Sequence, residues 1–155
     1  MWQSGINLAL GTDNVTNNNS YDMFKEMQLL GKVTSMLERE ANVIPTREIV
    51  RMATMGGAKA LGMEKEIGSL EVGKKADLIS LDLTEIGWAP HGFQDHYTSI
   101  VYSITGQHVR DVMINGDWVF RDNQLTKIDY PAACVQMEAD CTRLKQRVAS
   151  KSASE

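Results

Sequence analysis

The stretch INLALGTDNVTNNNSYDMF, residues 6–24, passes from a short apolar segment through a polar loop into a helical pattern. Residues 6–10 are apolar except for Asn7, which is typical of a strand buried on both faces of a parallel sheet. Residues 21–37 repeat apolar side chains at helical spacing and leave polar ones such as Glu26 for the solvent side. Strand, polar loop and helix in this order make half of a βαβ unit, so the stretch predicts an α/β fold.

A second helix is predicted from residue 46 to residue 61. Pro45 favours a helix start, and Gly62 stands where a left-handed C-terminal cap is expected. The pair Gly56-Gly57 inside this segment predicts a break into two short helices.

The following part of the chain has the pattern of a small β module. Residues 76–81 are a strand candidate, and Asn115-Gly116 supplies the two positive φ angles of a type I′ turn. We therefore expect a hairpin with strands near residues 111–114 and 117–121.

The chain ends in a helical pattern that starts at Pro131, whereas residues 97–103 fit either a short helix or a strand. The two cysteines are seven residues apart, about 10 Å along a helix, which is more than the 7 Å or so that a disulfide spans. We expect both to be reduced core residues. Apolar residues three and four apart predict that this helix packs along one stripe, formed by Cys134, Met137, Cys141, Leu144 and Val148.

Composition excludes several classes of function. The 155 residues are 43% hydrophobic and 23% charged with a formal net charge of -4, so no basic surface for nucleic acid or anionic membrane is implied. No apolar run approaches the roughly 20 residues of a membrane span, and the first residues lack a signal-peptide pattern. A cytoplasmic location is the default expectation.

Asp13 is the first candidate for chemistry, because it follows the predicted strand at the edge where α/β proteins place ligands. A carboxylate here suits Zn²⁺ or another divalent metal, but it could equally cap a turn or the next helix. Asn14, Asn17 and Asn18 could line a substrate pocket with amide groups, or they could be loop residues only. Spacing leaves both interpretations open.

The histidines do not form a recognisable metal motif. His91, His96 and His108 give neither His-x-His nor a helical i, i+4 pair, so we expect surface or structural roles for them. The sequence also lacks Gly-x-Ser-x-Gly and any complete phosphate-binding glycine motif.

Four segments together resemble metal-dependent amidohydrolases, in the branch of cytosine-deaminase-like aminohydrolases and triazine chlorohydrolases. They occur in the family's order: LALGTDNVTNNNSYDMFKEM, MATMGGAKALGM, IGSLEVGKKADLISLD and VRDVMINGDWVFRD. The resemblance implies the last strand and helices of a (β/α)₈ TIM-like barrel, part of a small β-sandwich and a C-terminal helix. The corresponding parts are residues 1–62, 63–125 and 126–155.

The resemblance also assigns roles. Asp13 matches the aspartate that ends the last barrel strand, binds the single divalent metal and moves protons during attack by metal-activated water. The substrate implied is a small heterocycle whose C–N bond is hydrolysed, and Asn14, Asn17 and Asn18 remain the candidates for lining its pocket. Zinc is the expected metal with iron as the alternative, and the parent enzyme is expected to be a homo-oligomer.

This chain departs from the family pattern because the histidine ligands have no counterpart before Asp13. Only 12 residues precede Asp13, whereas a full barrel needs about 250 residues. The sequence thus predicts the C-terminal fragment of a deaminating hydrolase that is inactive alone. Two alternatives stay open: a non-catalytic module that completes a barrel supplied by another chain, and a parent enzyme that removes chloride.

Overall fold

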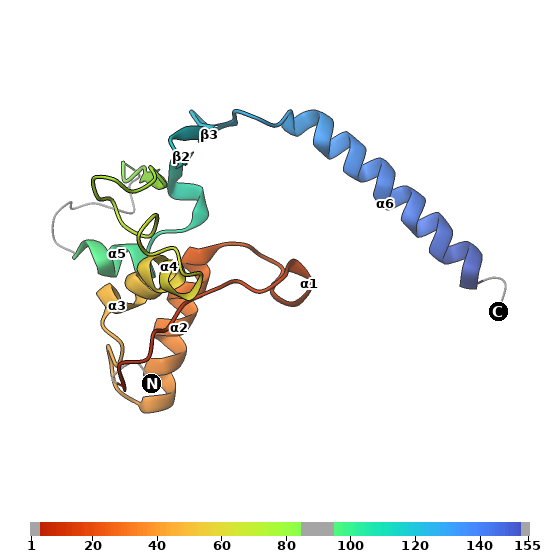
Figure 1. The fold of residues 1–155 in the computed structure, drawn as a ribbon. Coiled ribbons are helices and arrows are strands. Elements are labelled where there is room, and N and C mark those ends of the chain that lie inside the picture. The colour runs from red at the N-terminus through yellow and green to blue at the C-terminus, as the bar shows by residue number, and fades with distance from the viewer. Residues whose placement is uncertain (1–3, 85–94, 153–155) are drawn as a thin grey trace.

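The polar loop leads into a long helix, as the periodicity predicts. The computed structural model describes residues 4–84 and 95–152, and its elements are shown in Figure 1. A short helix α1 (Val15–Asn18) precedes α2 (Met23–Glu38). Asp22 caps α2 by accepting a hydrogen bond from the backbone N–H of Phe24.

Residues 6–10 differ from the strand that their apolar pattern predicts. They pair with no strand among the described residues, and Ile6 is 59% exposed. The segment lies instead along a helix: the N–H of Leu10 donates to the carbonyl of Met52 at 3.2 Å, and Asn7 Nδ2 donates to the carbonyl of Gly56 at 3.0 Å. A strand needs neighbouring strands for its backbone groups, and the described part of the chain places none beside this segment.

The second helical region stays continuous where a break was predicted. It consists of α3 (Thr46–Arg51), a π-helical segment η2 (Met52–Gly56) and α4 (Gly57–Ala60). The π-helical segment runs directly into α4 at the glycine pair, so Gly56 and Gly57 do not separate two helices. A Cβ on Gly56 would lie 2.2 Å from the carbonyl oxygen of Leu8, so Gly56 allows residues 6–10 to approach the helix backbone.

The hydrophobic core lies between α2, α3, η2 and α5 (His96–Tyr102). The structure thereby shows that residues 97–103, which the sequence left undecided, are largely helical. Ile49 and Val101 are fully buried. The buried residues that contact one another in this core are Phe24, Met27, Ile44, Ile49, Met52, Val101 and Ile104.

The β module is a four-stranded antiparallel sheet in the order β1-β2-β3-β4. Asn115 (φ 52°) and Gly116 (φ 84°) form its tight turn, which confirms the predicted hairpin. A 3₁₀ turn, η4 (Gly106–His108), leads into the second strand. The strands are β1 (Leu78–Leu81), β2 (Val109–Ile114), β3 (Asp117–Arg121) and β4 (Gln124–Leu125).

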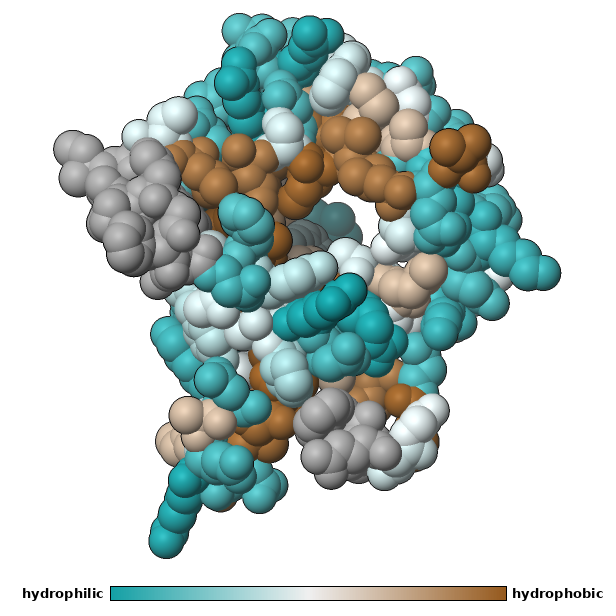
Figure 2. Space-filling view, turned by 90° about the vertical axis from the view of Figure 1, so that its left-hand side faces the viewer, coloured by the Kyte–Doolittle hydropathy of each residue, from teal (hydrophilic) through white to brown (hydrophobic). Residues whose placement is uncertain are grey.

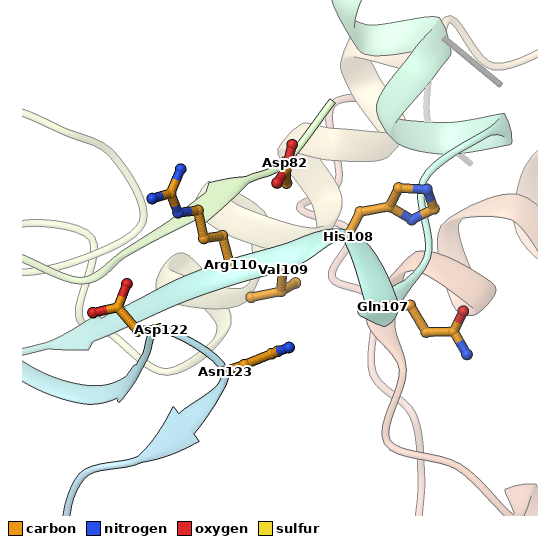
Figure 3. Close-up of a pocket in the computed structure, with 7 residues that line it drawn as sticks. All are labelled: Asp82, Gln107, His108, Val109, Arg110, Asp122 and Asn123. Carbon is orange, nitrogen blue, oxygen red and sulfur yellow. The ribbon is translucent and has the colours of Figure 1, made fainter. Parts of the chain in front are cut away.

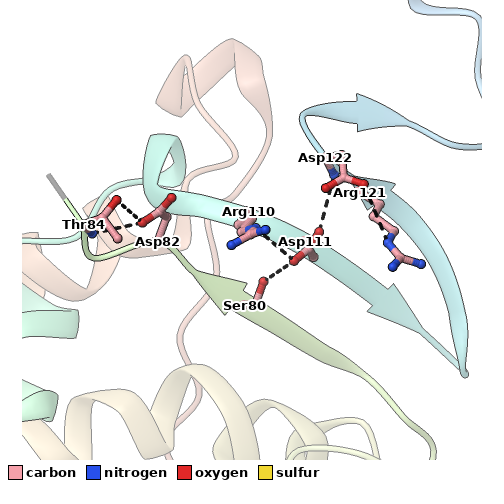
Figure 4. Close-up of polar contacts among 7 residues, drawn as sticks. All are labelled: Ser80, Asp82, Thr84, Arg110, Asp111, Arg121 and Asp122. Carbon is pink, nitrogen blue, oxygen red and sulfur yellow. Dashed lines mark hydrogen bonds and ion pairs between the residues drawn. The ribbon is translucent and has the colours of Figure 1, made fainter.

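Side-chain contacts around Asp111 join three segments of the sheet (Figure 4). Ser80 Oγ of β1 donates to Asp111 Oδ2 at 2.7 Å, and the N–H of Asp122 donates to Asp111 Oδ1 at 3.4 Å. The Ser80 hydroxyl is the main cause of the lowered pKa of Asp111. The carboxylate therefore helps to hold β1 and the end of β3 against β2.

The C-terminal helix α6 (Tyr130–Ser152) stands away from the other helices and the sheet (Figure 1). The helix is confirmed, but the packing of its apolar stripe is not seen among the described residues, since Met137, Leu144 and Val148 are 57–61% exposed. Both cysteines are free, as predicted; Cys134 is half-buried and Cys141 exposed, so neither is a core residue. None of the described helices has the length and apolar character of a membrane span.

Candidate active site

Asp13 adopts a left-handed backbone conformation, with φ at 57°. Aspartate and asparagine adopt this conformation more readily than other non-glycine residues, and six further non-glycine residues of the described chain also have positive φ. Asp13 comes three residues after the end of the segment 6–10 that lies against η2, and α1 begins two residues later. The carboxylate is therefore held at a fixed turn between the segment and the loop.

Two neighbouring asparagines donate to the Asp13 carboxylate. Oδ1 accepts from the backbone N–H of Asn14 at 2.7 Å and from Asn14 Nδ2 at 3.3 Å, while Oδ2 accepts from Asn17 Nδ2 at 3.1 Å. These bonds, that of Asn17 first, lower the pKa of Asp13 below its ordinary value. The side chain is thus an anion at neutral pH, which is the form that binds a cation or accepts a proton.

The helix α1 explains why both asparagines face Asp13. Asn14 is its N-cap and accepts the N–H of Asn17 at 3.1 Å through Oδ1. Asp13 therefore does not cap this helix, although such a cap was one interpretation of the sequence. The loop that the asparagine cluster forms serves to direct amide donors at the carboxylate.

Asn18 has a different role from Asn14 and Asn17. Its Nδ2 donates to the carbonyl of Thr12 and to Glu26 Oε1, both at 2.6 Å. Glu26 lies in the first turn of α2, so the amide ties the Asp13 loop to the helix. The sequence pattern assigned Glu26 to the solvent side, because helical spacing alone does not reveal a contact with a loop.

The described residues do not supply a complete set of metal ligands by themselves. No group of three or more His, Cys, Asp or Glu side chains within residues 4–84 and 95–152 is arranged to hold a metal ion. His96 begins α5, His108 Nδ1 accepts the N–H of Thr105 at 3.1 Å, and His91 lies outside the described residues. Asp13 can contribute one hard oxygen ligand, and four-coordinate zinc needs more.

A polar pocket of about 320 Å³ lies at the sheet, where β1 and β2 meet the β3–β4 turn (Figure 3). It combines the cation of Arg110 with the carboxylates of Asp82 and Asp122, so one negative charge of its lining is left without an opposite charge in that lining. The Asp13 carboxylate is the stronger candidate for chemistry, because amide donors of two asparagines converge on both of its oxygens.

Comparison with known proteins decides the family. The model of the amidohydrolase family matches residues 1–119 of this chain. The chain belongs to the amidohydrolase family. The match includes Asp13, the asparagine loop and the sheet as far as β3.

The relatives of this amidohydrolase chain are deaminases and a triazine hydrolase. It is 35% identical over 147 residues to a 5-methylthioadenosine/S-adenosylhomocysteine deaminase of Thermoanaerobacter pseudethanolicus. The aligned region covers 95% of this chain and 34% of the relative. It is 37% identical over 131 residues to an S-triazine hydrolase of Gordonia rubripertincta, covering 84% of this chain and 27% of the relative. The chain therefore spans about a third of the length of the curated relatives it matches.

Solved structures agree with this assignment. A zinc-bound adenosine deaminase from Xanthomonas campestris superimposes with a TM-score of 0.87 and 31% identity, covering 94% of this chain and 33% of that chain. A zinc complex of atrazine chlorohydrolase from Arthrobacter aurescens superimposes with a TM-score of 0.77 at 22% identity. The superposition covers 89% of this chain and 30% of that chain. The α/β fold is thus that of part of the barrel enzymes of this family.

Proposed function

We propose that this chain supplies the Asp13 carboxylate to a metal-dependent hydrolase that deaminates a small heterocyclic substrate. The observation that carries the proposal is the geometry of Asp13: an ionised carboxylate, placed at a turn with positive φ, that receives amide donors on both oxygens. The names of the relatives, which refer to adenosine-type nucleosides and triazines, favour a purine-like or triazine-like ring.

The hydrogen bonds suggest which Asp13 oxygen would act. Oδ1 accepts two donors from Asn14, whereas the structure gives Oδ2 one donor, from Asn17. An ionised carboxylate oxygen offers two lone-pair positions. We assign Oδ2 as the atom that would bind a divalent metal or hold a proton, with zinc, present in the structures of relatives, favoured over iron.

The asparagines would position this carboxylate as well as meet substrate. Asn14 and Asn17 contact Asp13 directly, which favours an orienting role for both. Asn18 anchors the loop to Glu26, so a substrate contact by Asn18 would have to coexist with that anchor. Contact of these three residues with the substrate is part of the proposal.

We further propose three structural parts and a cellular setting for the parent enzyme. Residues 1–62 would belong to the barrel, residues 63–125 to the small β-sandwich, and residues 126–155 would form the C-terminal helix and tail. The parent enzyme would be a cytoplasmic homo-oligomer.

A second candidate function is that of a module completing a barrel from another chain. A groove of about 1,010 Å³ is lined by apolar side chains of α2, α3, η2, β1, β2 and α5, including Met27, Ile79, Leu81 and Val112. Residues 6–10 also have no strand partner in the described part of the chain. Both features are surfaces that a further part of an amidohydrolase barrel would cover.

The central test is Asp13→Asn in the longest protein that contains this chain. The amide preserves shape but removes the charge, so ammonia release from adenosine, 5-methylthioadenosine and an aminotriazine should fall by at least about a thousandfold, as for a lost catalytic acid or base group. Circular dichroism and the unfolding midpoint should stay close to wild type. Retained turnover would show that Asp13 is not the catalytic carboxylate.

A parallel assay separates the two hydrolytic chemistries. The same protein is offered a chlorinated triazine, and chloride and ammonia are both measured. Ammonia without chloride supports the deaminase, whereas chloride release with no ammonia from any amine substrate supports the dechlorinating alternative.

A further inference from the structure

The helix α6 presents an apolar stripe that is mostly exposed to solvent in the described structure. Figure 1 shows the helix standing free of the core helices and of the sheet. Met137 is 61% exposed and Leu144 is 60% exposed, which is unusual for large apolar side chains at regular spacing. The stripe, which we call the α6 seam, consists of Cys134, Met137, Cys141, Leu144 and Val148.

The spacing of the α6 seam is that of a coiled coil. Its members alternate three and four residues apart, which corresponds to the a and d positions of successive heptads. A hollow of about 390 Å³ on the helix surface is bordered by Met137, Asp140, Cys141 and Leu144, among other residues. In the heptad numbering these four residues occupy positions d, g, a and d, in chain order. Four residues at such positions form the hole into which a side chain of a partner helix inserts.

The charges beside the seam are divided between the two halves of the helix. Glu138 and Asp140 flank the N-terminal half of the seam, and Lys145 and Arg147 flank the C-terminal half. Asp140 also pairs with Arg143 of its own helix. Acidic residues near the N-terminus and basic residues near the C-terminus of a helix interact favourably with its macrodipole. In addition, Glu138 and Lys145 occupy e positions and Asp140 and Arg147 occupy g positions, which lie next to the partner helix in a coiled coil.

We propose that α6 pairs antiparallel with α6 of a second copy of this chain. The two-fold arrangement sets the acidic half of each helix beside the basic half of the other, which gives the charge complementarity that orients such interfaces. In the central layer Cys141 of one copy faces Leu144 of the other. The same register places Met137 opposite Val148, Glu138 beside Lys145 and Asp140 beside Arg147.

A parallel pair fits the charges less well. It would place Glu138 beside Ala133 and Arg147 beside Ser152, so two of the four flanking charges would face uncharged residues. The antiparallel register instead opposes all four flanking charges with charges of opposite sign.

Charge reversal tests the surface in the full 155-residue chain. The wild type should sediment as a concentration-dependent dimer, and Glu138→Lys should weaken dimerisation at least about tenfold because it sets like charges side by side. Adding Lys145→Glu to the same chain restores opposite signs and should recover the dimer. Gln146→Lys, on the far side of the helix, is the matched control and should dimerise like wild type.

The native cysteines test the orientation. In the antiparallel register the Cys141 residues of the two copies lie about 4.5 Å apart along the axis, and the Cys134 residues about 25 Å apart. A short bifunctional thiol reagent should therefore cross-link Cys134→Ser, which retains Cys141, but not Cys141→Ser, which retains Cys134. Cross-linking of both variants would show a parallel pair and overturn the register.

Two further results would overturn the proposal, and neither bears on Asp13. One is a chain that stays monomeric at millimolar concentration while circular dichroism shows α6 helical. The other is a dimer that is unaffected by Glu138→Lys, because it would then form through another surface. Since turnover is not measured, the result is independent of the proposed hydrolase activity.

Discussion

Asp13 combines a left-handed backbone with a carboxylate that accepts hydrogen bonds on both oxygens. Aspartate tolerates this conformation, and the amides of Asn14 and Asn17 donate to its side-chain carboxylate. The same bonds lower the pKa of the Asp13 carboxyl group, which is exposed and already ionised at neutral pH at its ordinary value of 3.8.

Removing the Asn17 amide should raise the pKa of Asp13. The folded pKa is lowered below the ordinary 3.8 mainly by Asn17, so Asn17→Ala should move it back toward that value. A lowered carboxyl pKa contributes stability that is present above the unfolded pKa and lost as pH falls through the folded pKa, and this contribution should shrink in the variant. Carboxyl ¹³C NMR titration measures the shift.

Asp82 provides the internal control for that titration. Its pKa is lowered by Thr84, which has no contact with the Asp13 loop, so it should titrate identically in both proteins. An Asp13 pKa that does not change in Asn17→Ala would contradict the hydrogen bond to Oδ2.

At the scale of elements, Asn18 joins the loop to α2, and its loss should affect stability. Asn18→Ala removes bonds to Thr12 and to the charged Glu26, and we expect a loss of about 1–2 kcal/mol in the free energy of unfolding. Asn17→Ala, whose bond to Asp13 is solvent-exposed, should cost clearly less. Urea unfolding of both variants tests this; equal losses would argue against the anchor.

The contact between residues 6–10 and η2 depends on a missing side chain. A Cβ at position 56 would lie 2.2 Å from the Leu8 carbonyl oxygen, so Gly56→Ala should displace the segment and cost about 1–3 kcal/mol in the free energy of unfolding. Thermal unfolding measures the change.

The adjacent glycine is a matched control. A Cβ on Gly57 meets nothing within 4 Å, so Gly57→Ala should be neutral or stabilise by up to about 1 kcal/mol through helix propensity. If both variants behave alike, residues 6–10 do not pack against η2 as described.

At the scale of the whole molecule, the described structure leaves much apolar surface in contact with solvent. Figure 2 shows apolar residues gathered in several places on one face, and the groove between the core helices and the sheet is lined largely by apolar side chains. Such patches mark surfaces that another part of a protein covers. The sheet, the core and the free α6 are therefore best understood as parts of a larger assembly.

The isolated chain should consequently bind an apolar dye and fail to hold a metal tightly. We expect strong fluorescence of anilinonaphthalene sulfonate, substoichiometric zinc after dialysis and no ammonia release, because the described residues form no metal cluster. Mass spectrometry for metals and the ammonia assay provide the measurements. One tightly bound zinc per chain with turnover would show that this chain is a complete catalyst.

The sequence by itself determined the local features. The turn at Asn115 and Gly116 and the long helices α2 and α6 follow from residue types whose backbone preferences act over a few positions. The role proposed for Asp13 came from the resemblance of four segments to a known family, because spacing alone left it open. The tertiary structure alone decided that residues 6–10 lie against η2 without a strand partner in the described part of the chain, and that Gly56 admits Leu8. It also separated Asn17, which contacts Asp13, from Asn18, which contacts Glu26. These outcomes depend on which distant segments meet, and periodicity along one segment carries no information about its neighbours in space.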